Sequence, residues 1–280
     1  MKLVKILIPV GITAAVLFLT APINSCNKKV IIYDTTVVTI HDTTTITDTV
    51  GCCNINEDMV AYYTFTGGSL KDSSGNHNDI FFNNATKTTD RFGNANGAYL
   101  FDGASSYMQV KHNATLNPTS ISLMAVVKLN GFWNGTCHGN EILMKGYQDQ
   151  NQGVYGLRVA NNTVDCNAPA ADTTREYVQA FYGDYPQVAG AGDTTAAHTG
   201  QWMIVVFTYD GYESKLYVNG KLKKASAGTG IFTPNTNDLF IGRAENVNNL
   251  YWLNGVIDEI RIYNKALCAS AVAQFSKTAN

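Results

Sequence analysis

Residues 216–222 read Leu-Tyr-Val-Asn-Gly-Lys-Leu, and this stretch decides the fold class. Asn-Gly between alternating apolar and polar residues favours a two-residue type I′ turn, because both turn residues must take positive φ. The stretch therefore predicts a β-hairpin. Other β-rich runs bounded by Gly, Asn and Asp lie on both sides of it, at 60–65, 97–101, 107–110, 121–129, 202–209, 239–242 and 256–263.

Helical patterning is confined to residues 265–275. Many short strands that are joined by turn residues and not interleaved with helices are typical of an antiparallel sandwich. The length of this β-rich part suits one such domain rather than two. We therefore expect an all-β, two-sheet antiparallel sandwich.

Composition and charge exclude several classes of protein. The 280 residues are 45% apolar and only 15% charged, so the chain can bury a sizeable core. The net charge of −2 supplies no basic surface for nucleic acid. We expect neither a nucleic-acid partner nor a coiled coil or polytopic membrane protein.

The N-terminal residues have the pattern of an export signal. A short basic region precedes the apolar residues 6–19, a run shorter than the roughly 20 residues that span a bilayer. Residues 23–26 resemble the lipobox of bacterial lipoproteins, in a relaxed form with Asn24. The resemblance implies cleavage before Cys26 and acylation of Cys26, which would anchor the protein to the cell envelope. The alternatives are a plain secretory signal or an uncleaved anchor.

Residues 34–49 are half threonine, and their apolar residues are too sparse for a core. β-branched residues disfavour helix, so we expect an extended stalk, with a strand that pairs with a neighbouring chain as the alternative. The predicted organisation is a signal peptide at 1–25, a Thr-rich tether at 26–56 and one domain at 57–280.

Five cysteines follow Cys26. Export permits disulfides, and an odd count leaves one cysteine free or intermolecular. We predict that Cys137 pairs with Cys166. One of Cys52 and Cys53, which we take as Cys53, is predicted to pair with Cys268 and tie the two ends of the domain together.

The order of motifs along the domain carries a family resemblance. The motifs are the runs at 60–65, 71–79 (KDSSGNHND), 100–103 (LFDG), 107–110, 201–202, 209–211, 216–220, 241–242 and 253–267 (LNGVIDEIRIYNKAL). This ordered set resembles the laminin-G-like jelly rolls of the concanavalin A-like lectin/glucanase superfamily, from about residue 58 to 275. The resemblance implies a jelly roll of two packed, curved antiparallel sheets. Residues 131–200 form a longer insertion than usual, where we expect binding specificity to lie.

Catalytic carboxylates are not evident in the sequence. Glycosidases of this superfamily carry them at alternate strand positions, because only residues i and i+2 face the same groove. Asp258 and Glu259 are adjacent, so we expect them on opposite faces. Two other acidic pairs lie in loop-like sequence, Asp172 with Glu176 and Asp149 with Glu141. We therefore expect no enzymatic activity.

Calcium is the metal that the resemblance implies. Calcium prefers six to eight oxygen ligands, which the loop around Asp72 and Asn78 could supply. This loop resembles one that often lies near calcium in related jelly rolls, and Asp258 takes the place of a calcium-binding aspartate in several members. We expect a structural Ca²⁺ held by Asp72, Asn78 and Asp258. Alternatively, Asp72 and Asn78 form turns and Asp258 pairs with Arg261 or Lys265.

Exposed aromatic side chains beside polar groups are the candidates for sugar binding. They are Trp133, Tyr147, Tyr182, Tyr185 and Trp252. The alternative for each of them is packing in the core or at a sheet edge.

These observations together predict a non-catalytic, lipid-anchored surface protein of the bacterial outer membrane or cell surface. Its predicted partner is an extracellular carbohydrate or a surface protein, bound through the loops of the jelly roll. The alternatives are a glycoside hydrolase or lyase, and a purely structural surface protein, because fold alone does not fix function.

Overall fold

The computed structural model describes residues 54–133, 139–146, 152–161, 176–184, 188–190, 199–245 and 250–278. The predicted signal peptide, Cys26 and the tether up to residue 53 lie outside the described residues, as do Cys53, Cys137 and Cys166.

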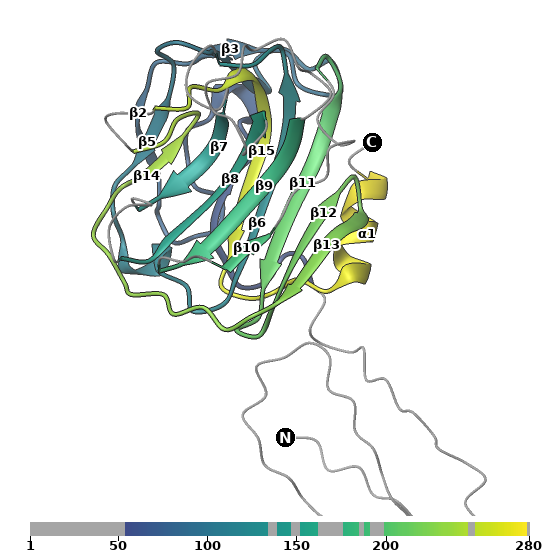
Figure 1. Cartoon of the computed structure of the whole chain (residues 1–280). Helices are drawn as coiled ribbons and strands as arrows, with labels where there is room; N and C mark the ends of the chain where they lie inside the picture. Colours follow the sequence, from purple (N-terminus) through teal and green to yellow (C-terminus); the bar gives the residue numbers. More distant parts are fainter. Residues whose placement is uncertain are drawn as a thin grey trace, which may run out of the picture.

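Two antiparallel sheets stack face to face and form one sandwich (Figure 1). The eight-stranded sheet has the order β13-β12-β11-β6-β15-β4-β3, and β1 also pairs with β15. Its strands are β1 (Met59–Tyr63), β3 (Thr86–Thr88), β4 (Ala98–Asp102), β6 (Ile121–Leu129), β11 (Trp202–Tyr209), β12 (Glu213–Val218), β13 (Lys221–Ala227) and β15 (Asn254–Tyr263).

The seven-stranded sheet has the order β10-β9-β8-β7-β14-β5-β2. Its strands are β2 (Ile80–Asn83), β5 (Met108–Val110), β7 (Asn140–Lys145), β8 (Val154–Asn161), β9 (Glu176–Gly183), β10 (Val188–Gly190) and β14 (Leu239–Ile241). Two short 3₁₀ helices, Thr66–Gly68 and Ala114–Leu116, lie in the connections. The architecture confirms the predicted two-sheet antiparallel jelly roll.

The hairpin that the sequence predicts joins β12 to β13. Asn219 has φ of 50° and Gly220 has φ of 75°, as a type I′ turn requires. Asn219 also accepts a hydrogen bond on Oδ1 from the backbone N–H of Ile204, at 2.8 Å. The turn is thereby attached to the adjacent strand β11.

The core lies between the two sheets and is made of the inward residues of each strand. Val127, Phe207 and Ile260 come from the eight-stranded sheet, and Leu157 and Tyr182 come from the seven-stranded sheet. All of these residues are buried. Burial of apolar surface on this scale is the main term that stabilises the fold.

A single helix, α1 (Ala269–Thr278), packs against the outer face of the eight-stranded sheet (Figure 1). The predicted helix at 265–275 begins too early, because tertiary hydrogen bonds fix the preceding residues. Ser122 Oγ donates to Lys265 O at 2.7 Å and accepts from Leu267 N at 2.8 Å. Within the described residues, no helix has the length and apolar character that crossing a bilayer requires.

Residues 131–200, predicted as an insertion rich in loops, supply the strands β7, β8, β9 and β10 of the seven-stranded sheet. Their pattern is hard to recognise because polar residues are buried in them. Lys145 is buried, and its Nζ donates to Asn235 Oδ1 at 2.5 Å and Asn117 Oδ1 at 3.1 Å. Glu141 is buried at the other end of β7.

Candidate functional site

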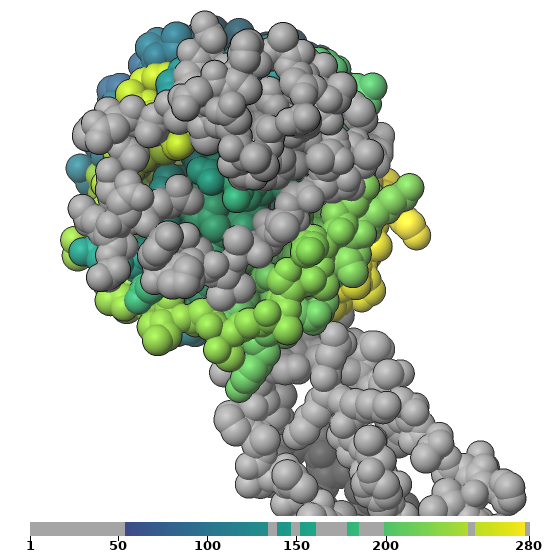
Figure 2. All heavy atoms as spheres, viewed as in Figure 1, coloured from purple at the N-terminus to yellow at the C-terminus, as the bar shows by residue number. Residues whose placement is uncertain are grey.

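The outer face of the seven-stranded sheet carries a row of side chains that runs from β9 to β2. Except in β2, at least one neighbour of each of these residues along its strand belongs to the core between the sheets, so the row lies on the opposite face of the sheet. Strand register orders the row as Phe181, Gly156, Met144, Phe240, Gln109 and Phe82. We call it the outer row. Figure 2 looks onto this face and shows the teal atoms of the sheet at the floor of a recess.

At one end of the outer row, aromatic rings surround the guanidinium of Arg243. Its central carbon lies 4.3 Å from the ring centroid of Tyr107, 4.5 Å from that of Phe240 and 5.7 Å from that of Trp252. Phe82 adds a fourth ring, 4.6 Å from that of Tyr107. Guanidinium groups bind aromatic faces through the ring quadrupole. We call Arg243 and these four aromatic residues the Arg243 cluster.

A turn after β14 positions Arg243. Gly242 has φ of 83°, a conformation that favours glycine, and its N–H donates to Ile142 O at 3.0 Å. Leu253 N donates to Gly242 O at 2.9 Å, and Ala244 N donates to Leu250 O at 2.7 Å. These bonds hold the chain before and after Arg243 alongside the segment that carries Trp252.

At the other end of the outer row lies Arg158, on β8. Its Nε donates to Gln179 Oε1 at 2.7 Å, and its central carbon lies 5.3 Å from the ring of Phe181 and 5.5 Å from that of Tyr251. Trp133 packs edge-on against Tyr251, with ring centroids 5.6 Å apart. The face thus combines aromatic rings with hydrogen-bonding groups at both ends.

Glu141 lies next to Arg158 in the register of β7 and β8. Its side chain is fully buried, and neither carboxyl oxygen has a hydrogen-bond partner. Gly156 makes room for it, since a Cβ there would lie 2.9 Å from Glu141 Oε1. Burial raises the pKa of Glu141 to about 8, although Arg158 acts in the opposite direction. The group is therefore mostly a neutral acid at pH 7.

The predicted sugar-binding residues fall into three groups according to where the structure places them. Trp252 and Trp133 lie at this face, whereas Tyr147 and Tyr185 lie outside the described residues. The prediction for Tyr182 is wrong, because its side chain is 1% exposed and belongs to the core. Its hydroxyl donates to the carbonyls of Pro118 and Thr119 at 2.8 and 3.0 Å.

Sequence reasoning missed most of the Arg243 cluster. Tyr107 and Phe240 lie in predicted strands whose faces the sequence analysis does not assign, and Arg243 follows the motif at 241–242 without being a candidate itself. The signal that could have identified them is alternation: Leu239 and Ile241 face the core, so Phe240 must face outward.

The predicted calcium residues Asp72 and Asn78 belong to one hydrogen-bonded loop beside β1. Asp72 Oδ1 accepts from the backbone N–H of Tyr62 and of Ser74, each at 2.9 Å, and Oδ2 accepts from Ser74 Oγ at 2.8 Å. Asn78 Nδ2 donates to Val60 O at 2.8 Å and to Thr115 Oγ1 at 3.1 Å, and the buried Oδ1 of Asn78 has no hydrogen-bond partner. This loop stabilises the outer edge of β1.

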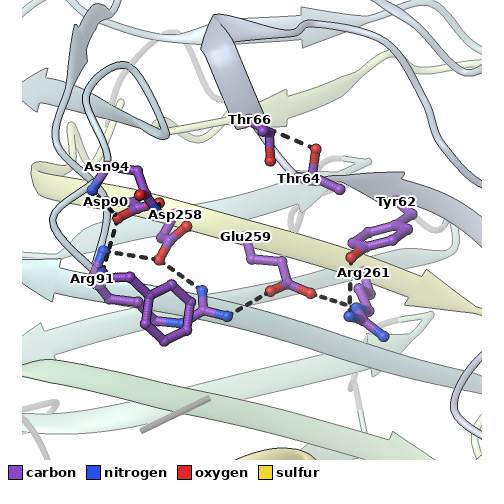
Figure 3. Close-up of polar contacts among 10 residues, drawn as sticks. Tyr62, Thr64, Thr66, Asp90, Arg91, Asn94, Asp258, Glu259 and Arg261 are labelled. Carbon is purple, nitrogen blue, oxygen red and sulfur yellow. Dashed lines mark hydrogen bonds and ion pairs between the residues drawn. The ribbon is translucent and has the colours of Figure 1, made fainter. Parts of the chain in front are cut away.

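Asp258 is not part of this loop. It lies on β15, which pairs with β1, and it binds Arg91. Arg91 Nη1 donates to Asp258 Oδ2 at 2.7 Å, and Arg91 Nη2 donates to Glu259 Oε2 at 3.0 Å (Figure 3). The prediction that these adjacent carboxylates face opposite ways is wrong. The register of β15 against β6 shifts between Ile257 and Glu259, and such a bulge brings consecutive residues to one side.

The three predicted residues therefore do not form one calcium site. Asp72 and Asn78 bond the loop to one edge of β1, whereas Asp258 is neutralised by Arg91. In the described parts of the chain, no group of three His, Cys, Asp or Glu residues is arranged to hold a metal ion. The basic partner of Asp258 is Arg91, and neither Arg261 nor Lys265.

A second hollow of about 400 Å³ lies beside this ion-pair network, between α1 and β1. Arg261 forms part of its wall: Nε donates to Glu259 Oε1 at 2.5 Å and Nη2 to Tyr62 OH at 3.1 Å. Because two arginines face two carboxylates here, the charges of the network balance. The hollow is lined by Ile55, Asn56, Tyr62, Arg91, Phe92, Glu259, Arg261, Ala271, Gln274 and Phe275.

Cys268 precedes α1 and is disulfide-bonded. The other cysteines of the chain lie outside the described residues, so the pairings of Cys53 with Cys268 and Cys137 with Cys166 stay predictions.

The fold is a jelly roll of two packed antiparallel sheets. The family model of the concanavalin A-like lectin/glucanases superfamily matches residues 102–273. The chain belongs to this superfamily. No curated protein sequence matches it.

Solved structures of the same fold include domain 4 of the extracellular arabinanase AbnA from Geobacillus stearothermophilus, in complex with arabinotriose. This match has 23% identity and a TM-score of 0.55, and covers 78% of this chain and 98% of that one. The binding domain of botulinum neurotoxin DC in complex with SialylT matches with 14% identity and a TM-score of 0.56, covering 81% of this chain and 53% of that one. At these identities the likeness shows the fold alone.

Proposed function

We propose that this chain is a non-catalytic, lipid-anchored surface protein that binds an extracellular carbohydrate on the outer face of its seven-stranded sheet. The observation that carries the proposal is the set of partly exposed aromatic residues at the two ends of the outer row, Tyr107, Trp252 and Trp133. Within the row itself, Phe181, Met144 and Phe240 are only 2–5% exposed and form the floor beneath these residues. Ligand sites combine apolar and aromatic surface with a few placed polar groups, as this face does. Two proteins of the same fold are described as complexes with arabinotriose and SialylT, which adds support.

Arginine pairing supports the non-catalytic part of the proposal. Glycoside hydrolysis uses two carboxyl groups that flank the scissile bond. Asp258 and Glu259 lie together, but Arg91 binds Asp258 Oδ2 and Glu259 Oε2, and Arg261 binds Glu259 Oε1. The lipid anchor rests on the lipobox-like residues 23–26 and on the apolar run before them.

A glycan array, followed by calorimetric titration of the best ligand, tests the binding function. We expect Tyr107→Ala and Trp252→Ala each to weaken binding by about tenfold or more, since such a loss corresponds to about 1.4 kcal/mol of contact free energy. Tyr212→Ala is the matched control, because Tyr212 is 72% exposed in the turn between β11 and β12. Unchanged affinity in both cluster variants would refute binding at this face.

The anchor and the non-catalytic role have tests of their own. In cells that express the full chain, metabolic labelling with a fatty-acid analogue should label the protein processed at Cys26, and Cys26→Ser should abolish the label. Incubation of the protein with each array-positive glycan should release no new reducing ends; release of reducing ends would favour the hydrolase alternative.

A further inference from the structure

The guanidinium of Arg243 is held in place by rings and has unused hydrogen-bond donors. Three aromatic faces contact it, at 4.3, 4.5 and 5.7 Å. Among the described residues, no carboxylate, side-chain oxygen or carbonyl accepts a hydrogen bond from it, and its Nε is shielded from solvent. Burial also lowers the pKa of Arg243. Arg243 as a whole is partly exposed, but a shielded donor such as its Nε seldom lacks a hydrogen-bonding partner in a folded protein.

The acidic residue nearest to Arg243 along the chain is not its ion-pair partner. Glu245 lies two residues on, but its Oε2 accepts a hydrogen bond from Asn237 Nδ2 at 2.9 Å, and within the described residues it forms no ion pair with Arg243. By contrast, Arg91 and Arg261 both form ion pairs with carboxylates, although Arg91 Nε, like Arg243 Nε, has no hydrogen-bond partner. Arg243 therefore differs from these two arginines in that no carboxylate of the described residues pairs with its guanidinium.

We propose that the carbohydrate bound at the outer row is acidic, and that its carboxylate is bound by the guanidinium of Arg243. Guanidinium presents paired donors that match the two oxygens of a carboxylate. The rings of Tyr107 and Trp252 lie beside this cation and can pack against the apolar face of the sugar ring that carries the carboxylate. Phe82 extends the same surface and is 36% exposed. This inference rests on the proposed function and specifies its ligand class.

Three acidic saccharides and their methyl esters test the inference: trigalacturonate, a glucuronate disaccharide and sialyllactose. Esterification removes the charge and adds one methyl group to each carboxyl group, while the sugar and its linkage stay the same. For at least one of the three, we expect the acid to bind the folded protein about tenfold to 100-fold more tightly than its ester, the range of a charge-assisted contact. Equal binding of every acid and its ester would overturn the inference.

Variants at Arg243 test whether this residue causes the preference for the acid over its ester. Arg243→Gln should remove the difference between acid and ester, and Arg243→Lys should keep a reduced difference, because lysine retains the charge but not the paired donors. Lys221→Gln is the control, since it removes the same charge from the exposed strand β13. An acid preference that persists in Arg243→Gln would overturn the inference. If Arg243→Gln does not fold, competition by free galacturonate against galactose on the unaltered protein decides.

The result separates this inference from the proposed function. Neutral glycans that bind through Tyr107 and Trp252 with no preference for acids would uphold the proposed function and overturn the acidic ligand. A sulfated disaccharide that competes as well as the carboxylate would overturn the assignment to a carboxylate. Absence of all glycan binding would overturn both.

Discussion

Asp258 and Glu259 are neighbours in sequence, and both of their carboxylates bind one guanidinium, that of Arg91. The bulge that allows this lies where β15 changes partners, because β4 pairs with it as far as Ile257 and β1 pairs with it from Ile260. Arg91 thus binds β15 between the regions that β4 and β1 occupy. Its side chain is 10% exposed, so the contacts form in a poorly solvated place.

Removal of Arg91 should destabilise the domain strongly. In Arg91→Met the carboxylates of Asp258 and Glu259 stay buried and lose their shared cation, which costs about 3–5 kcal/mol in comparable buried pairs. Burial already raises the pKa of Asp258 in the intact protein. Urea unfolding at pH 7 measures the loss. A control is Lys71→Met, which breaks an ion pair with Asp79 in which the lysine is 78% exposed. Equal effects of the two variants would contradict this account.

Glu141 should make the stability of the domain depend on pH. The pKa of Glu141 in the folded protein, about 8, lies above its ordinary value of 4.5. The stability that its neutral form contributes is therefore fully present below pH 4.5 and is lost as the pH rises through 8. Unfolding in urea between pH 5 and 9 measures it. Glu141→Gln should abolish this decline, whereas Glu57→Gln, at an exposed site, should retain it. A wild-type stability that is flat over this interval would refute the prediction.

Tyr182 should matter for stability and not for ligand binding. Tyr182→Phe keeps the ring in the core but leaves the carbonyls of Pro118 and Thr119 without this donor, which costs about 1–2 kcal/mol. Thermal unfolding should show the loss, while the glycan titration should give an unchanged Kd. A higher Kd in a folded Tyr182→Phe protein would show that Tyr182 takes part in binding.

Gly242 should affect both stability and binding. Its φ of 83° is strained for any other residue, and a Cβ would overlap the ring of Phe101. Gly242→Ala should lower the free energy of unfolding by about 1–3 kcal/mol and weaken glycan binding, because it displaces the adjacent Arg243. Gly228→Ala is the matched control, since a Cβ there has nothing within 4 Å. Wild-type affinity in Gly242→Ala would show that the turn does not position Arg243.

The fold was predictable where apolar alternation and turn chemistry agree. The strands β6 and β11 occupy the predicted ranges, and Asn219-Gly220 forms the predicted turn. The prediction failed where buried polar residues interrupt the pattern, as Glu141 and Lys145 do in β7. Such residues depend on partners far along the chain, which local sequence does not reveal.

The candidate site was predictable only in part, for the same reason. Trp252 and Trp133 could be named as aromatic residues in loops, but the faces of Tyr182 and Phe240 depend on strand register. The bulge at Asp258 shows the limit most clearly, because one extra residue reverses the side to which every following side chain would point. Counting alternate residues along the sequence cannot detect such a bulge.

The Arg243 cluster draws its members from both ends of the domain, since Phe82 and Tyr107 lie on early segments and Phe240 and Trp252 on late ones. No proteolytic fragment that lacks either end can contain it. During refolding, ligand affinity should return only with the slowest long-range strand pairing, later than the hairpin of β12 and β13 forms. Measurement of ligand affinity is therefore an assay for complete folding of the domain.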